Sequence, residues 1–132
     1  MTLDFAFLCD YADATGKVNA LGIGVDSIYA PQVPARHPQF FVVVQMRASV
    51  VEAGARSFTV CLIDADGRSL LEQNGQFELA RPVGGTETNA RLVMGFYNVE
   101  FPRFGRYSFH IAVDRTELVR IPLNVLPIPG AG

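Results

Sequence analysis

Several residue types that functional sites commonly use are scarce in this sequence of 132 residues. It contains two cysteines, two histidines and one lysine, Lys17. The cysteines and histidines have no close spacing, so we expect no metal site. No run of Lys or Arg is present and the formal net charge is −2, which argues against nucleic acid or an anionic membrane surface as a partner. Apolar runs such as Phe40–Val44 are far below the ~20 residues that a membrane-spanning helix needs.

We expect no secretory signal, because no positive segment followed by an apolar one precedes the first alternating strand. We therefore expect a cytoplasmic protein in which Cys9 and Cys61 are reduced thiols rather than a disulfide. Cys61 lies on the outer phase of its strand and is the better candidate for a reactive thiol. No basic residue near it in the sequence would lower its pKa.

Few residues are candidates for catalysis. Nucleophilic catalysis requires a base, usually histidine, within hydrogen-bond reach of the nucleophile. His110 lies on the polar phase of its strand, which favours a solvated surface residue, and His37 lies in a proline-rich connection that it could order by a hydrogen bond. An enzyme would need His37 close to Cys61 or to an aspartate. We therefore expect no catalytic residue and no cofactor, and we expect that the protein is not an enzyme.

The stretch 104–125 contains the clearest structural signal. Apolar residues alternate with polar ones in two runs, which indicates two strands that each have one buried face. The four-residue polar break 114–117 between them predicts an antiparallel hairpin. Because Pro122 cannot donate a hydrogen bond to a neighbouring strand, we expect the last strand to lie at a sheet edge. The alternating apolar residues are Tyr107, Phe109, Ile111 and Val113 in the first run, and Val119, Ile121, Leu123 and Val125 in the second.

The whole chain predicts an all-β fold. About eight strands with turn signals roughly every ten residues, and no convincing helix, are typical of a sandwich or barrel. A proline-rich connection at 30–38 fits the crossover between two sheets. The run Gly105–Phe109 is similar to the Gly-x-Tyr-x-Cys run of immunoglobulin-type domains, which predicts a tyrosine corner at Tyr107. We expect an immunoglobulin-like antiparallel β-sandwich of about eight strands, with a single domain at 1–126 and a flexible tail at 127–132.

Several short segments together resemble a known family over nearly the whole chain. They are Asp4–Ala12, Gly16–Asn19, Gly22-Ile23, Pro34–Pro38, the turn Asp64–Gly67 and the Gly-x-Tyr strand that ends at Val113-Asp114. With these segments the sequence resembles a family of small bacterial β-sandwich proteins of unknown function. This resemblance implies a β-sandwich and brings no activity, cofactor or catalytic residue. One departure from the family is Arg115-Thr116 after Asp114, where a glycine turn would be usual.

The leading functional hypothesis is a non-enzymatic domain that binds a protein partner or itself. The predicted strand 39–51 is apolar on both faces in its middle, so it is either covered within the fold or faces a partner. The predicted edge strand at the C-terminus could pair with another chain. The residues predicted to form this interface are Phe41, Val43, Leu118, Arg120 and Leu126.

An alternative hypothesis is a sandwich that binds a small ligand, although a small molecule is less expected than a protein partner. Gly22 and Gly24 fall on one phase of the predicted strand 18–29, where glycine weakens a strand unless something approaches closely or a bulge is needed. The pocket would have these glycines as its floor and the connection Pro31–Pro38 as its lid. It requires a concave apolar pocket with a few convergent polar groups.

Overall fold

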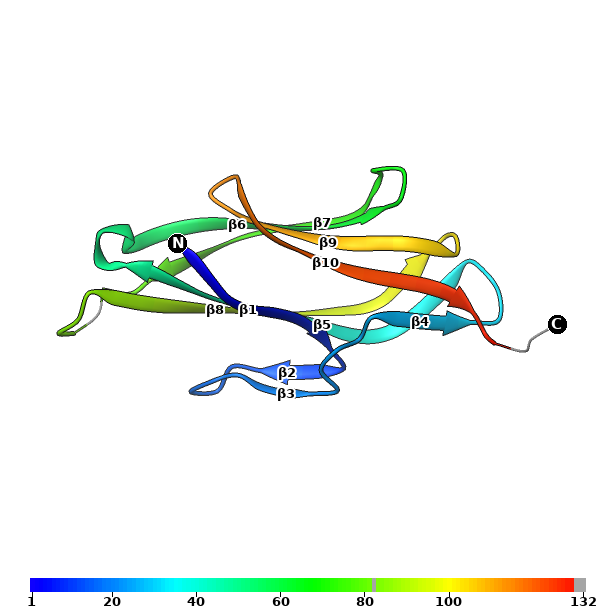
Figure 1. Ribbon diagram of the computed structural model, residues 1–132, viewed down its shortest axis with the longest axis horizontal. Coiled ribbons are helices and arrows are strands. Elements are labelled where there is room, and N and C mark those ends of the chain that lie inside the picture. The colour runs from blue at the N-terminus through cyan, green and yellow to red at the C-terminus, as the bar shows by residue number, and fades with distance from the viewer. Residues whose placement is uncertain (82, 130–132) are drawn as a thin grey trace.

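The structure is a computed structural model that describes residues 1–81 and 83–129 (Figure 1). These residues form ten strands and one short 3-10 turn, η1 (Val50–Glu52). The all-β prediction is therefore confirmed. The strands are β1 (Thr2–Cys9), β2 (Tyr11–Asp13), β3 (Asn19–Leu21), β4 (Ser27–Ala30), β5 (Ala35–Ser49), β6 (Gly54–Asp64), β7 (Ser69–Leu79), β8 (Glu87–Phe101), β9 (Gly105–Val113) and β10 (Thr116–Pro127).

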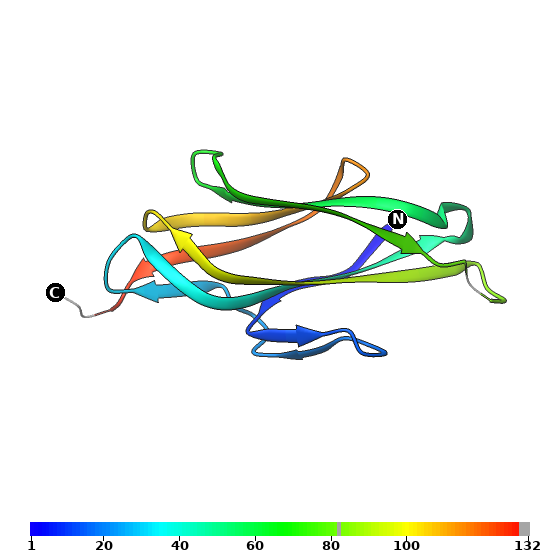
Figure 2. The same ribbon diagram turned by 180° about the vertical axis from the view of Figure 1, so that it is seen from behind.

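Two principal sheets lie face to face, as both side views show (Figures 1 and 2). The first sheet has the order β1-β5-β8, and the second has the order β4-β10-β9-β6-β7. The hairpin β2–β3 forms a separate two-stranded sheet below the first one (Figure 1). The main core lies between the two principal sheets and includes the fully buried rings of Phe40, Phe101 and Phe109.

The architecture is more elaborate than an antiparallel sandwich of about eight strands. Strand β4 pairs in parallel with the end of β10, with Ser27 opposite Asn124 and Ala30 opposite Pro127. The predicted strand 18–29 is broken into β3 and β4, because Gly22 and Gly24 adopt positive φ angles of 68° and 99° that interrupt an extended chain. The predicted connection 30–38 is also shorter, since β5 begins at Ala35.

Strand β5 is the central strand of the first sheet and is covered on both faces in its middle, which explains why both faces are apolar there. It pairs along its length with β8, from Ala35 opposite Phe101 to Ser49 opposite Glu87, and on its other side with β1. Phe40, Val42 and Val44 enter the main core, whereas Phe41 and Val43 enter a second cluster on the opposite face of the sheet. Because both faces of this part of β5 are covered, neither of them faces solvent.

The predicted hairpin is confirmed, with strands β9 and β10 joined at Asp114 and Arg115. Both linking residues have positive φ, 49° and 69°, as a two-residue hairpin turn of this hand requires. The Asp114 carboxylate accepts a hydrogen bond from the Ser57 amide at 3.0 Å and pairs with Arg56 at 2.9 Å. These bonds to β6 hold a turn that contains no glycine.

The predicted position of β10 at a sheet edge is confirmed over part of its length. Strand β4 pairs only with residues 124–127 of β10. Among the described residues, the part of β10 before that point has β9 as its one strand partner. Pro122 lies in this part and is exposed, opposite Ser108 of β9, which agrees with the usual place of proline on an edge strand.

Tyr107 forms the predicted tyrosine corner. Its hydroxyl donates a hydrogen bond of 2.6 Å to the carbonyl oxygen of Arg103, four residues upstream, and accepts one of 3.3 Å from the Arg103 amide. The ring packs edge-on against Phe101 at a centroid distance of 5.0 Å. Phe109, two residues further along β9, packs against Phe40 and Phe96 at 5.5 Å from each. These three phenylalanines form an aromatic cluster in the main core.

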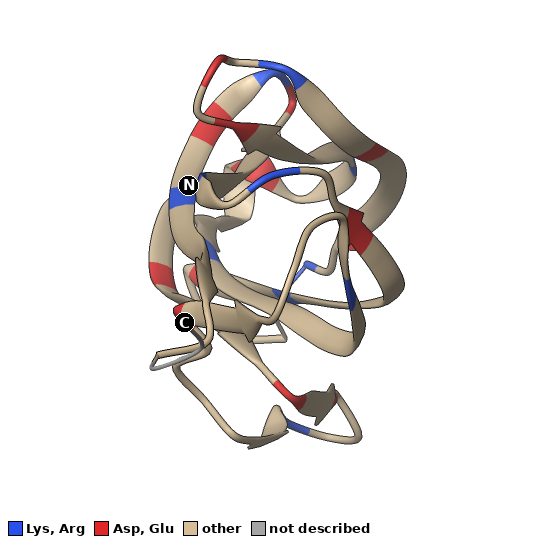
Figure 3. Ribbon diagram, turned by 90° about the vertical axis from the view of Figure 1, so that its right-hand side faces the viewer, with Lys and Arg blue, Asp and Glu red and all other residues tan. Residues whose placement is uncertain are grey.

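Charged residues of both signs are interspersed around the molecule (Figure 3). Several form pairs at the surface, among them Arg47 with Asp4 at 2.9 Å and Arg103 with Asp66 at 3.0 Å. Exposed pairs of this kind contribute little to stability. Cys9 and Cys61 are both free thiols and lie in different sheets.

Candidate functional site

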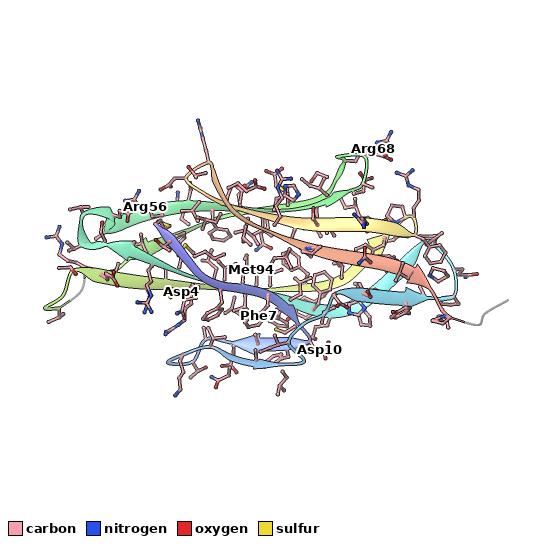
Figure 4. The ribbon with its side chains drawn as sticks, in the orientation of Figure 1. Asp4, Phe7, Asp10, Arg56, Arg68 and Met94 are labelled. Carbon is pink, nitrogen blue, oxygen red and sulfur yellow. The ribbon has the colours of Figure 1, made fainter. Side chains whose placement is uncertain are left out.

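The hairpin β2–β3 folds back under the first sheet and is held there by backbone hydrogen bonds. The Asp10 amide donates to the Leu21 carbonyl at 3.0 Å, and the Gly24 amide donates to the Leu8 carbonyl at 2.9 Å. Asp10 lies at the bend where the chain leaves β1 for the hairpin (Figure 4). The hairpin and the sheet bury a second apolar cluster between them, composed of Cys9, Ala12, Phe41 and Val43.

An apolar groove of about 630 Å³ lies between β1 and this hairpin. Phe5 and Phe7, which share the outer face of β1, stack with ring centroids 5.8 Å apart and form one side. Phe7 points from β1 toward the hairpin (Figure 4). On the opposite side Leu21 and Ile23 are 69% and 61% exposed. We call this feature the β1–β3 groove; its lining residues are Phe5, Phe7, Tyr11, Asp13, Val18, Asn19, Ala20, Leu21 and Ile23.

The Asp13 carboxylate, which lines the β1–β3 groove, already accepts hydrogen bonds from within the hairpin. Asp13 Oδ1 accepts hydrogen bonds from the Thr15 amide at 3.3 Å and from Asn19 Nδ2 at 3.1 Å. Just outside the groove, Gln45 and Arg47 donate to the carboxylate of Asp4 and lower its pKa. The groove therefore offers mainly apolar surface to whatever enters it.

The five residues of the predicted interface do not come together. Phe41 and Val43 belong to the first sheet, and the prediction that they face a partner is wrong, because the chain's own hairpin β2–β3 buries them. Leu118, Arg120 and Leu126 lie on β10 in the second sheet. Leu118 is half-buried against the main core, Arg120 is exposed beside Glu117, and Leu126 is half-buried opposite Tyr29 of β4.

The predicted small-ligand pocket has a different lining from the one expected. Gly22 and Gly24 lie in an irregular segment rather than on a strand, and the Asp10 side chain packs against Gly22. Ile23, between the two glycines, lines the β1–β3 groove, but no residue of Pro31–Pro38 does. The proposed lid is divided, because Ala35–Pro38 belongs to β5.

His37 lies in the first sheet and Cys61 in the second, so these two do not form a nucleophile and base. The His37 ring packs beside Phe40 at a centroid distance of 5.6 Å, and burial lowers its pKa. Burial likewise raises the pKa of the thiols of Cys9 and Cys61, with a further increase from the nearby carboxylates of Asp10 and Glu72.

His110, unlike His37, lies between two polar side chains, and the sequence did not predict these contacts. On the outer face of the second sheet, Ser108 Oγ lies 2.7 Å from His110 Nε2, and His110 Nδ1 lies 3.2 Å from Glu117 Oε1. The prediction of a solvated His110 overlooked its neighbours, because His110 is 23% exposed and in contact with two polar side chains. The spacing of two residues between Ser108 and His110 on one strand was the available signal.

The residues that the structure describes contain neither a cluster of metal ligands nor a membrane-spanning helix. No group of three or more His, Cys, Asp or Glu side chains there is arranged to hold a metal ion. No helix in that part of the chain is long and apolar enough to cross a membrane.

Comparison with known proteins gives a family but no activity. The model of a family described as "Family of unknown function (DUF6941)" matches residues 4–126. A search of curated proteins found no match.

The solved structures with similarity to the chain are distant. One is the Pseudomonas fluorescens alkylpurine DNA glycosylase AlkC bound to DNA containing an abasic site analogue, with a TM-score of 0.44 and 9% identity over 92% of this chain and 30% of that one. Another is a beta-glucuronidase from glycoside hydrolase family 2, with a TM-score of 0.42 and 13% identity over 70% of this chain and 10% of that one. The chain thus spans less than a third of either.

Proposed function

The chain belongs to DUF6941, a family of unknown function, and we propose that it is a protein-binding domain whose β1–β3 groove takes an extended segment of a partner protein. The observation that carries this proposal is the exposure of Leu21 and Ile23 beside the stacked rings of Phe5 and Phe7. Contiguous exposed apolar surface of this kind is typical of interaction sites.

The strands beside the groove favour an extended occupant. Within the described residues, β1 pairs only with β5 and β3 only with β2, so each has one edge without a strand partner. An extended segment can add to such an edge through its backbone while its alternate side chains enter apolar pockets. Asp13 is the charged residue among those that line the groove, which favours a segment with basic as well as apolar side chains.

A pull-down from the native cytosol tests this proposal. The baits are the wild-type chain, the double variant Leu21→Asp/Ile23→Asp, and the control Val51→Asp, in which another strongly exposed apolar residue far from the groove is changed. We expect a stoichiometric partner with the wild type and the control, and its loss with the double variant. Equal recovery with all three baits, or a wild-type monomer that recovers nothing, would contradict the proposal. A shift to a dimer in sedimentation that depends on Leu21 and Ile23 would identify a second copy as the occupant.

A second candidate function is the binding of an apolar small molecule in the same groove. The volume of about 630 Å³ supports it, since ligand sites commonly measure roughly 300–1,000 Å³. Native mass spectrometry of the freshly purified protein distinguishes the two candidates. An added mass that the double variant lacks favours the small ligand, and a bare chain mass argues against it.

We also propose an immunoglobulin-like fold and a cytoplasmic location for this domain. The tyrosine corner at Tyr107 supports an immunoglobulin-like ancestry for the two principal sheets. The two free thiols, Cys9 and Cys61, are compatible with a reducing bacterial cytoplasm.

A further inference from the structure

We propose that the outer face of the second sheet carries an acyl-transfer site in which Ser108 is the nucleophile, His110 its base, and small carboxylic esters the substrates. The site goes beyond the proposed binding function and is separate from the β1–β3 groove, which lies on the outer side of the other principal sheet. Two observations support the site. Ser108 contacts His110, which in turn contacts Glu117, and a hollow lies beside Ser108.

The contacts determine which nitrogen of His110 carries the proton. Glu117 Oε1 lies 3.2 Å from His110 Nδ1, and a carboxylate can only accept, so Nδ1 carries the imidazole proton. Nε2 is then the acceptor for the Ser108 hydroxyl, whose oxygen lies 2.7 Å away. This order of hydroxyl, imidazole and carboxylate is the arrangement that activates a serine nucleophile on unrelated folds.

The fold brings these three residues together for simple reasons. Ser108 and His110 alternate on β9 with Phe109 and Ile111, which are fully buried, and so point outward. Glu117 follows the hairpin turn on β10 and is opposite Ala112, diagonal to His110.

Arg120 holds the carboxylate in place. Its Nε donates to Glu117 Oε1 at 2.6 Å, and this bond, followed by the charge of Arg120, lowers the pKa of Glu117. Glu117 is therefore a positioning residue that is kept ionised.

A hollow of about 440 Å³ beside Ser108 gives a substrate somewhere to bind. Arg106, exposed and two residues before Ser108 on the same face of β9, lines it, and among the described residues its guanidinium forms no ion pair. Asn124 lines it from β10. Both side chains can donate hydrogen bonds to the oxyanion that forms when a carbonyl is attacked. The remaining lining residues are Asp64, Ala65, Tyr107 and Pro122.

The proposed reaction is ester hydrolysis in two steps. In the first, Ser108 Oγ forms a bond to the ester carbonyl carbon while its proton passes to His110 Nε2; the bond to the alcohol oxygen then breaks, and His110 returns the proton to the departing alcohol. In the second, water attacks the acyl-serine with His110 again as base, and the carboxylic acid leaves with Ser108 restored. The sum is ester plus water giving acid plus alcohol, with no redox change.

Labelling with a fluorophosphonate probe tests the nucleophile directly. This probe bonds to activated serine hydroxyls, so intact-mass and peptide analysis should show one addition, located at Ser108, in the wild-type chain. Ser69→Ala is the matched control, because the Ser69 hydroxyl donates to the Leu71 carbonyl and has no histidine partner. We expect labelling to survive Ser69→Ala and to disappear in Ser108→Ala and His110→Ala. A wild-type chain that stays unlabelled, or that is labelled equally without His110, would overturn the proposal.

Hydrolysis of p-nitrophenyl acetate tests the roles of the other residues. We expect Ser108→Ala and His110→Gln to reduce kcat by about a hundredfold or to background, as the loss of a general base does. Glu117→Gln should lower kcat with little change in KM, and Glu117→Asp, which retains the charge, should recover part of the rate. A merely structural carboxylate would not give this recovery. Rates that are the same in the wild type and Ser108→Ala would show that the three residues only brace the hairpin.

Discussion

The Asp10 carboxylate lies directly against the Cα atom of Gly22, so closely that a β-carbon at this position would collide with it. Gly22 also has a positive φ of 68°. Gly22 directly follows the end of β3 and precedes Ile23, which lines the β1–β3 groove.

Gly22→Ala should therefore destabilise the protein by more than Gly24→Ala does. Both glycines have positive φ, but a β-carbon at Gly24 would meet nothing within 4 Å. We expect about 1 kcal/mol for the strain alone at Gly24 and about 2 kcal/mol at Gly22, where the Asp10 side chain must also rotate away. Urea unfolding of the two variants measures the difference, and equal losses would show that the Asp10 contact relaxes without cost.

Tyr107→Phe removes the hydroxyl of the tyrosine corner and leaves the Arg103 carbonyl without its 2.6 Å hydrogen bond. The expected loss in free energy of unfolding is about 1–3 kcal/mol, because a buried polar group loses its partner. Tyr29→Phe serves as the control, since that ring is exposed and should tolerate the same change. A loss no greater than that of the control would show that water replaces the bond.

Val43→Ala should destabilise the protein by about 2 kcal/mol, because it removes two methyl groups from a fully buried site. Leu21→Ala, on the exposed side of the β1–β3 groove, should change stability by no more than about 0.5 kcal/mol. Chemical denaturation of both variants checks the assignment of Val43 to the interior. A stable Val43→Ala variant would contradict the packing of the hairpin β2–β3.

Acid should destabilise the protein in part through Asp114. The Ser57 amide, together with Arg56, lowers the pKa of Asp114 in the folded chain. A carboxyl whose folded pKa lies below its unfolded value contributes stability above the unfolded pKa, about 3.9, and loses that contribution as the pH falls through the folded pKa.

The unfolding free energy should accordingly fall less steeply on acidification in Asp114→Asn than in the wild type. Unfolding curves at a series of pH values from about 5 downward measure this slope. Asp26→Asn is the control, because the exposed side chain of Asp26 makes no hydrogen bond or ion pair within the described part of the chain. A slope for Asp114→Asn equal to that of the wild type would show that other carboxylates dominate.

The two thiols should differ in their accessibility. Cys9 is fully buried and Cys61 is half-buried, and both have raised pKa values. An aromatic disulfide reagent should therefore titrate Cys61 slowly in the native protein, at a rate that increases with pH, and should reach Cys9 only after unfolding. Cys61→Ser should abolish the native reaction. A fast native reaction of both thiols would contradict the burial of Cys9.

The alternation of apolar and polar residues determined by itself that the chain is all-β and that β9 and β10 form a hairpin. The run Gly105–Phe109 predicted the tyrosine corner by its motif, and the hydrogen-bond partner that the structure shows, Arg103, is only four residues from Tyr107. Side-chain alternation and turn chemistry act over a few residues, so the sequence displays them directly.

Only the tertiary structure decided what covers each face and which side chains meet. The apolar outer face of β5 was compatible with a partner, and the hairpin β2–β3 covers it instead because Asp10 and Gly22 turn the chain back beneath the sheet. The approach of Glu117 to His110 likewise depends on the register of β9 with β10 and on the bulge between Glu117 and Val119. Such contacts arise from the pairing of whole strands, and a pattern of period two does not contain the register that sets them.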